Sequence, residues 1–507
     1  MKRILPVFLF LLLTLAGTAR TRVNFDADWL FTLGDDSTMA APSYNDSSWR
    51  RLSLPHDWAI EGDFSVSNPS GASGGALPGG VGWYRKHFRI QKASPDDRVL
   101  VTFDGVYMNS TVYINGHALG TRPYGYSTFE YDLTPYLKED GENILAVRVD
   151  NSDQPNSRWY SGCGIYRHVW LTTCASLHVS QWGVHVTPQL KKGNVWNVKV
   201  DVVLQDDGQN GQRPKLRHQL IAPDGRVVAK CEGGSLGQTL TVRKPVLWDI
   251  YQGNVYQVMT EVVVGGKVVD CVYTPTAFRT FCFDAQTGFW LNGKNVKLNG
   301  VCEHHDFGAL GSALNEDALH RKLVRLMEMG VNAIRCSHNP PAPELLNMCD
   351  TMGLIVMDES FDMWRRRKTK NDYARFFDEW HERDLSDLVR RDRNHPSIFI
   401  WSIGNEVLEQ WSGADADELT LEQANLILNA GHDASTLAHG DNLSPNSLLT
   451  IHLADIIKRY DTTRPITAGC NEPSPDNHLF KSGAIDLIGF NYHHQWVKDV
   501  PKNFPGT

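Results

Sequence analysis

Short runs of alternating apolar and polar residues fill the first half of the chain. Residues 112–114 form such a run before Asn115-Gly116, a dipeptide that favours a two-residue β-hairpin, and residues 143–149 form another. In residues 22–180, apolar residues do not recur every three to four positions as they do in an amphipathic helix. This region therefore predicts a β-sandwich, to which we assign the jelly-roll type.

The next region, residues 181–277, repeats the β pattern on a smaller scale. Apolar and polar residues alternate through 198–202, and two valine-rich runs, 262–264 and 267–269, flank Gly265-Gly266. Alternation of this kind over about a hundred residues suits an immunoglobulin-like β-sandwich. A second, smaller sandwich is therefore predicted.

From residue 284 onward, apolar strands alternate with amphipathic helices. Asn315 begins a helix that ends before Gly330, and His395-Pro396 ends a longer one. Strands are predicted at 296–298, 331–336, 354–358, 398–403, 465–468 and 485–490, and further helices at 342–352 and 448–460. Such alternation indicates parallel strands joined by helical crossovers.

This pattern predicts an incomplete (β/α)8 TIM barrel over residues 284–507, with about six of the eight strands that close a barrel. An open doubly wound sheet would fit the same strand count. No glycine-rich phosphate-binding turn follows the first strand, however, so the barrel is the better fit.

The first 19 residues have the pattern of a secretory signal peptide. Lys2 and Arg3 precede an apolar run at 4–15, and small residues follow at 16–19. The run is shorter than the ~20 apolar residues that span a bilayer. We therefore expect export to the periplasm or the extracellular space, without membrane insertion.

Composition narrows the class of partner. The net charge is -8 and no long run of Lys or Arg occurs, whereas a nucleic-acid reader normally carries a basic patch. Nine Cys are scattered without a C-x-x-C motif, as expected of buried small apolar residues rather than a disulfide framework. We expect no nucleic-acid partner.

Polar side chains gather where the predicted barrel strands end, which is where barrel active sites lie. They are Glu303, His304, His305 and Asp306; Arg335, Cys336, Ser337 and His338; Asp358 and Glu359; Asn405 and Glu406; and Asn491, Tyr492 and His493. For Asp358 and Glu359, structural hydrogen bonds and function are equally good interpretations. Adjacent histidines on a strand point to opposite faces, and no third ligand stands at the usual spacing, so zinc is not expected.

Glu406 is the carboxylate for which a purely structural role is least convincing. It comes shortly after the apolar run 398–401, at a position of low dielectric constant. Such surroundings favour the protonated form that a general acid needs. The neighbouring Asn405 is a neutral donor and acceptor suited to a sugar hydroxyl.

Two long segments resemble the signatures of glycoside hydrolase family 2. Residues 392–406 resemble the acid/base signature, and residues 332–340, continuing to 350–357, resemble the second one, except that Asn339 stands where Tyr is more usual. Further similarity covers 54–58, 159–167 and 288–294. The resemblance spans most of the chain after residue 19, and the family's domain order matches the one inferred from the pattern.

The resemblance implies a retaining mechanism with two carboxylates about 5–5.5 Å apart. It assigns Glu406 as the acid/base and Asn405 to the 2-hydroxyl of the sugar. By the same resemblance, His304 and His338 bind the glycone, Tyr492 donates a hydrogen bond to the nucleophile, and Arg335 stabilises its charge.

Neither a metal nor another cofactor is expected. After Asp358-Glu359, Met363 and Arg365 stand where the magnesium ligands of some family galactosidases would be. The family nucleophile, a Glu on the seventh strand, is expected shortly after Tyr492, and neither Glu303 nor Glu472 is at its position. We therefore expect an N-terminal portion of a longer enzyme that has little or no hydrolytic activity by itself.

The sequence of residues 403–406, Ile-Gly-Asn-Glu, is more similar to that of the family's β-galactosidases than to that of its glucuronidases or mannosidases. This resemblance implies exo-acting cleavage of terminal β-D-galactosides. A β-linked oligosaccharide or glycoconjugate is the expected substrate, and a homo-oligomer is left open. The alternatives are a β-glucuronidase or another family 2 glycosidase, and a non-catalytic carbohydrate-binding protein.

Overall fold

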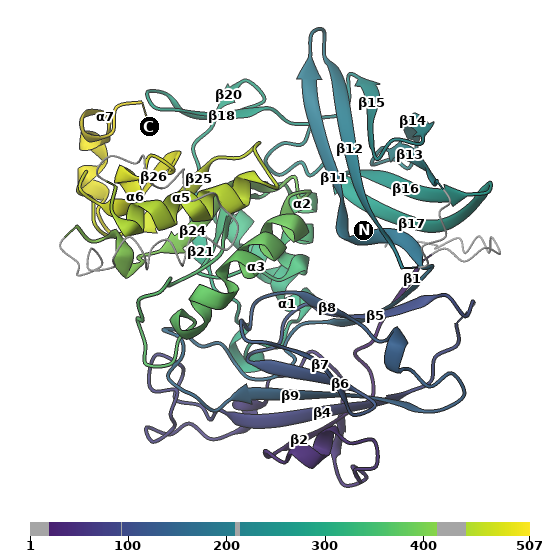
Figure 1. Ribbon diagram of the computed structural model, residues 1–507. Coiled ribbons are helices and arrows are strands. Elements are labelled where there is room, and N and C mark those ends of the chain that lie inside the picture. Colours follow the sequence, from purple (N-terminus) through teal and green to yellow (C-terminus); the bar gives the residue numbers. More distant parts are fainter. Residues whose placement is uncertain (1–19, 93, 208–212, 413–442, 507) are drawn as a thin grey trace, which may run out of the picture.

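The computed structural model describes residues 20–92, 94–207, 213–412 and 443–506, and it contains two β-sandwiches and a curved parallel sheet (Figure 1). The predicted signal peptide, residues 1–19, lies outside the described residues. In Figure 1 the first sandwich is at the bottom, the second at the upper right, and the parallel sheet with its helices at the left.

The first sandwich is built from two antiparallel sheets. One holds, in spatial order, β1 (Thr21–Asn24), β10 (Val169–Cys174), β5 (Arg98–Phe103) and β8 (Phe129–Asp132). The other holds β3 (Arg50–Leu52), β2 (Trp29–Leu33), β4 (Gly80–Phe88), β9 (Asn143–Asn151), β6 (Ser110–Ile114) and β7 (His117–Arg122). Side chains from both sheets, including Trp29, Phe103 and Val147, form its core.

The hairpin predicted at Asn115-Gly116 is present between β6 and β7. Both residues have positive φ angles, 50° and 85°, as the tight hairpin turn requires. The predicted strand at 143–149 is also confirmed, as β9.

The second sandwich also has two antiparallel sheets. One holds β11 (Leu177–Lys191), β12 (Val195–Asp206) and β15 (Gly237–Arg243). The other holds β14 (Val227–Gly233), β13 (Lys215–Ile221), β16 (Tyr256–Val264) and β17 (Lys267–Thr276). Val198, Val200 and Val202 point into its core, as their alternation predicts.

A small antiparallel sheet links the second sandwich to the parallel sheet. It consists of β18 (Phe281–Asp284), β19 (Gly288–Leu291) and β20 (Lys294–Asn295). The strand predicted at 296–298 is wrong, because the first parallel strand begins at Gly300. Val296 and Leu298 are apolar because they pack, outside any strand, against the cluster that contains Phe289 and Phe399.

Six parallel strands follow in sequential order: β21 (Gly300–Glu303), β22 (Ala333–Cys336), β23 (Ile355–Glu359), β24 (Ile398–Asn405), β25 (Ile466–Cys470) and β26 (Leu487–Phe490). In the described part of this unit the helices are α1 (Glu316–Glu328), α2 (Pro343–Met352), α3 (Ala374–Asp392), α5 (Pro445–Lys458), α6 (His478–Lys481) and α7 (Val500–Asn503). We call this unit the half-barrel. It confirms the predicted fold class of a jelly roll, an immunoglobulin-like sandwich and an incomplete TIM barrel.

Capping side chains explain where helices α1 and α5 begin. The Asn315 side chain accepts a hydrogen bond from the Ala318 N–H, which caps α1 as predicted. Helix α5 begins at Pro445, earlier than predicted, because the Ser444 side chain caps it through the Ser447 N–H. No helix among the described residues has both the length and the apolar content needed to cross a bilayer.

Buried contacts join the first sandwich to the half-barrel. Arg122, on β7, donates to Asp384 and Asp387 of α3 at 2.7 Å each. Arg167 donates to the carbonyl oxygens of Pro340 and Pro341 at 2.9 and 3.2 Å. The sandwich is thereby held next to the ends of the barrel strands.

Candidate active site at the mouth of the half-barrel

The carboxyl ends of the parallel strands meet at one end of the half-barrel, which we call its mouth. There Arg335, at the end of β22, donates through Nε and Nη2 to the Glu359 carboxylate at 3.1 and 2.8 Å. The same guanidinium donates to Asn405 Oδ1 at 2.9 Å and to Asn491 Oδ1 at 3.1 Å. Arg335 therefore connects side chains from β22, β23, β24 and the residue after β26.

Glu359 is a fully buried anion with every side-chain oxygen engaged. Besides Arg335, it accepts hydrogen bonds from Ser402 Oγ at 2.6 Å and His338 Nδ1 at 2.5 Å. Burial alone would raise the pKa of Glu359, but the Arg335 charge and the His338 hydrogen bond lower it below the ordinary value. Of its two interpretations, the structural one fits this residue: Glu359 anchors Arg335 and His338.

Asp358 precedes Glu359 on β23 and, by strand alternation, faces the opposite side. It is buried, and burial together with the nearby Asp392 carboxylate raises its pKa well above the ordinary value. Asp358 is therefore packed near the end of α3, outside the network of Arg335.

Glu406 directly follows β24 and has a positive φ of 46°, a conformation that costs a non-glycine residue about 1–2 kcal/mol. Its backbone N–H donates to the Gly469 carbonyl oxygen at 2.6 Å. Its carboxylate accepts from Asn491 Nδ2 at 2.8 Å and lies 3.8 Å from Arg158 Nη1. A strained backbone that the surrounding structure holds in place is common at functional sites.

The orientation of the Asn405 amide is set by its three partners. Its Oδ1 accepts from Arg335 Nη2 and Asn491 Nδ2, both at 2.9 Å, and its Nδ2 donates to Asp362 Oδ1 at 2.8 Å. The second Nδ2 hydrogen has no partner among the described residues and can donate to a ligand. Asp362 also accepts from Lys368 Nζ at 3.0 Å, so it is firmly held.

Three aromatic rings line the site next to this network. The ring centroids of His304 and His338 are 5.4 Å apart, and the Trp159 ring lies 5.0 Å from the first and 5.5 Å from the second. Burial and the neighbouring His338 lower the pKa of His304, which favours the neutral imidazole. Its buried Nδ1 has no hydrogen-bond partner among the described residues.

Tyr492 lies at the open edge of the site, with 80% of its surface exposed and a φ of 65°. The Glu406 carboxylate raises the pKa of Tyr492, so the phenol keeps its proton. Tyr492 is thus a hydrogen-bond donor next to Glu406. Its predicted contact with a nucleophile stays a prediction.

The structure brings together all six residues selected from the sequence: His304, Arg335, His338, Asn405, Glu406 and Tyr492. Their individual roles stay predictions. Glu303 instead binds Lys322, and Glu472 accepts from the Ser412 N–H and Oγ at 2.9 and 2.7 Å. Within the described residues, neither carboxylate shares a hydrogen bond with Arg335, Asn405 or Glu406.

Sequence reasoning missed Arg158, Asp362 and Lys368. Arg158 precedes a segment that resembles the family, but nothing in the sequence shows that a sandwich loop reaches the barrel mouth. Asp362 and Lys368 follow β23 in an irregular segment without a pattern. In the described part of the chain, no group of three His, Cys, Asp or Glu side chains is arranged to hold a metal ion.

Comparison with known proteins identifies the family. Residues 21–175 match the glycosyl hydrolases family 2 sugar binding domain, residues 177–279 match a further glycosyl hydrolases family 2 domain, and residues 285–503 match the family's TIM barrel domain. The three matches follow the order of the two sandwiches and the half-barrel.

Individual relatives agree with this. The chain is 56% identical over 497 residues to Beta-galactosidase BoGH2A of Bacteroides ovatus, a match that covers 96% of this chain and 58% of that protein. It is 42% identical over 394 residues to a putative beta-glucuronidase of Formosa agariphila, covering 76% of this chain and 37% of that protein.

A solved structure, a beta-glycosidase from Bacteroides vulgatus, superposes with a TM-score of 0.82 at 37% identity, over 96% of this chain and 58% of that one. The chain thus spans little more than half the length of these two Bacteroides relatives. The domain order, the strand-end site and these matches together show that the chain belongs to glycosyl hydrolase family 2.

Proposed function

We propose that the chain is the part of an exo-acting retaining glycoside hydrolase that binds and protonates terminal β-D-galactosides of oligo- or polysaccharides. The observation that carries the proposal is the placement of Glu406. Its carboxylate is held by Asn491 at the barrel mouth, beside Asn405 and the rings of His304 and His338. The 56% identity to a protein named β-galactosidase supports galactose as the sugar.

In this proposal Glu406 protonates the glycosidic oxygen and later removes a proton from water. The free Nδ2 hydrogen of Asn405 donates to the 2-hydroxyl, where hydrogen bonds strengthen in the transition state. His304 and His338 bind the remaining hydroxyls of the glycone.

Arg335 and Tyr492 act on the second carboxylate, which a retaining enzyme places about 5–5.5 Å from the first. Arg335 would stabilise its charge, and the protonated Tyr492 would donate to it. The described carboxylates near Glu406 are Glu359 and Asp362, and both are already bound by cations. The described residues near Glu406 thus offer no unbound second carboxylate, and we expect the 507 residues alone to bind galactosides with negligible turnover.

A β-glucuronidase is the second candidate, because a relative at 42% identity and one at 30% identity are named putative beta-glucuronidase. The two sugars differ at C6, which carries a hydroxymethyl group or a carboxylate, and in the configuration of the C4 hydroxyl. Comparing 4-nitrophenyl β-D-galactoside with the β-D-glucuronide distinguishes them. We also propose that residues 1–19 direct export of the protein.

The test uses a longer polypeptide that contains these 507 residues together with a segment that provides the second catalytic carboxylate. Glu406→Gln should slow lactose cleavage about 10²–10⁴-fold, the usual contribution of general acid catalysis. The kcat/KM for 2,4-dinitrophenyl β-D-galactoside should fall much less, because it reports formation of the intermediate and that leaving group needs no proton. Undiminished lactose cleavage by the variant contradicts the proposal.

Glu472→Gln is the matched control. Glu472 is as buried as Glu406, at 8% exposure each, and lies after the adjacent strand β25. It should leave lactose cleavage unchanged. Turnover of 4-nitrophenyl β-D-galactoside by the 507-residue chain at the rate of longer relatives would show that these 507 residues already contain the second carboxylate.

A further inference from the structure

Arg158 comes from the first sandwich, between β9 and β10, yet its guanidinium lies at the barrel mouth. Its Nε and Nη2 donate to the two carboxylate oxygens of Asp362 at 2.9 and 2.5 Å. Asp362 is 2% exposed and also binds Lys368 and Asn405. The Arg158 side chain is therefore fixed in place by a two-point ion pair.

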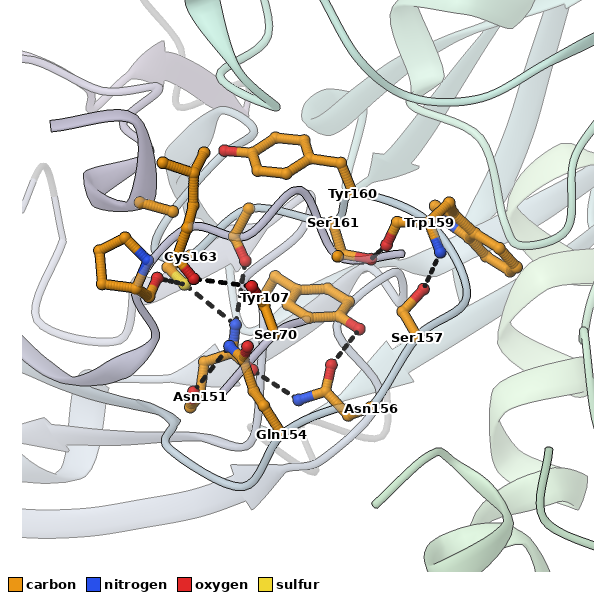
Figure 2. Close-up of a pocket in the computed structure, with 15 residues that line it drawn as sticks. Ser70, Tyr107, Asn151, Gln154, Asn156, Ser157, Trp159, Tyr160, Ser161 and Cys163 are labelled. Carbon is orange, nitrogen blue, oxygen red and sulfur yellow. Dashed lines mark hydrogen bonds between the residues drawn. The ribbon is translucent and has the colours of Figure 1, made fainter. Parts of the chain in front are cut away.

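The backbone around Arg158 is held just as firmly. Figure 2 shows the cavity next to this segment, in which Asn156 Oδ1 accepts from the Tyr107 hydroxyl at 3.0 Å and Ser157 Oγ accepts from the Trp159 N–H at 3.3 Å. The Trp159 indole N–H donates to the Tyr126 hydroxyl at 3.2 Å. The segment is thus positioned before any ligand binds.

This arrangement leaves one part of the guanidinium available. Nη1 makes no hydrogen bond to any described residue, and it lies 3.8 Å from Glu406 Oε2. About a third of the side chain, 34%, is exposed. An arginine has five N–H donors, and the ion pair with Asp362 uses only two of them.

The separation of 3.8 Å suits one bridging oxygen. An atom placed about 2.9 Å from Nη1 and about 2.9 Å from Glu406 Oε2 lies within hydrogen-bond distance of both. If Glu406 is the proton donor, as proposed above, the substrate atom within its reach is the glycosidic oxygen. A charged donor at that point also favours the negative charge that develops on the departing oxygen.

We propose that Arg158 is a substrate-binding residue whose Nη1 donates a hydrogen bond to the glycosidic oxygen that Glu406 protonates. The inference rests on the proposed function, and it gives the first sandwich a direct part in recognising the bond to be cleaved. A role limited to joining the two domains is the competing explanation.

A pair of ligands separates the two explanations. Methyl β-D-galactoside and methyl 1-thio-β-D-galactoside differ only in the bridging atom, and sulfur is a much weaker hydrogen-bond acceptor than oxygen. Their binding is measured by isothermal titration calorimetry on the full chain and on Arg158→Met, which keeps much of the apolar stem. The variant should bind the oxygen glycoside about tenfold or more weakly and the thioglycoside less than threefold more weakly.

Equal weakening for both ligands overturns the proposal, because it would show that Arg158 only maintains the shape of the site. Equal binding by the variant and the wild type overturns it as well. If the wild type binds neither galactoside, the proposed function itself has failed, and this inference falls with it.

Two further variants control for folding. Arg148→Met removes a similar two-point ion pair of the same sandwich, to Asp35 at 2.7 and 2.8 Å, and should bind both ligands as the wild type does. Arg158→Lys keeps the charge but cannot reproduce the two-point geometry. If Arg158→Met fails to fold, Arg158→Lys replaces it in the binding test. Arg158→Lys should lose more affinity for the oxygen glycoside than for the thioglycoside, and equal losses would contradict the proposal.

Discussion

Arg335 and Glu359 form an ion pair in which the carboxylate is completely buried. Arg335 donates to Glu359 Oε2 through Nε at 3.1 Å and Nη2 at 2.8 Å, and to Oε1 through Nη2 at 3.1 Å. Removing the arginine leaves a buried charge whose remaining partners, among the described residues, are His338 and Ser402. Arg335→Met should therefore lower the free energy of unfolding by about 3–5 kcal/mol, as measured by urea denaturation. Arg325→Met, which breaks an exposed pair with Glu328, should change it by about 0.5 kcal/mol. A loss for Arg335→Met as small as that of the control would contradict this reading.

The contact between Arg122 and Asp384 couples the first sandwich to helix α3. Both side chains are buried, and Ser127 and Tyr373 also donate to the Asp384 carboxylate. Arg122→Ala should cost about 3–5 kcal/mol and separate the unfolding of the two domains in calorimetry. Arg51→Ala, which breaks an exposed pair with Asp28, serves as control. A single unfolding transition at the wild-type temperature would show that other contacts are enough to couple the two domains.

The ionisation of His168 should make the folded protein less stable at alkaline pH. Burial alone would lower its pKa, but the hydrogen-bonded Asp26 and the nearby Glu344 and Asp104 raise it from 6.5 to about 9. Because the folded-state pKa is the higher one, the stabilisation is complete below about pH 6.5 and disappears as the pH rises through 9. We expect a loss of about 1–2 kcal/mol, after allowance for partial solvent access.

His168→Gln should remove this alkaline loss, since glutamine does not titrate. The measurement is the free energy of unfolding from urea denaturation at pH 6, 8 and 10 for the wild type and the variant. His117→Gln changes an exposed histidine and should leave the wild-type pH profile intact. Parallel profiles for the wild type and His168→Gln would contradict the assignment.

Trp159 supports the two histidines that we assign to the glycone. Its ring packs against both imidazoles, so Trp159→Ala should free them and remove an apolar surface. Galactoside affinity should fall up to about tenfold, in line with about 0.5–1.5 kcal/mol for such contacts. Trp159→Phe keeps a ring at the position and should lose less. Equal affinities for the wild type and Trp159→Ala in calorimetry would show that the ring is not part of the binding surface.

Much of the fold could be predicted from the sequence because its elements have strong local causes. The Asn115-Gly116 turn and the Asn315 cap each depend on a few neighbouring residues, and both are confirmed. The strand predicted at 296–298 failed because apolar residues outside a strand can be buried by a distant surface, here Phe289 and Phe399. Sequence periodicity does not register such tertiary packing.

The candidate site also contains residues that the sequence could identify and residues that only the tertiary structure reveals. Arg335, Asn405 and Glu406 could be selected because barrel chemistry gathers at strand ends and because they lie in long family signatures. Arg158 and Asp362 could not, since their meeting depends on how two domains pack together. Glu359 could be located but not interpreted, because its anchoring role follows from the partners that surround it.

The most direct test of the account is a crystal structure of the chain with methyl β-D-galactoside bound. The account predicts the sugar at the barrel mouth, with its glycosidic oxygen about 3 Å from the Glu406 carboxylate and its hydroxyls on His304, His338 and Asn405. A galactoside bound on either sandwich, with the barrel mouth unoccupied at saturating sugar, would contradict it.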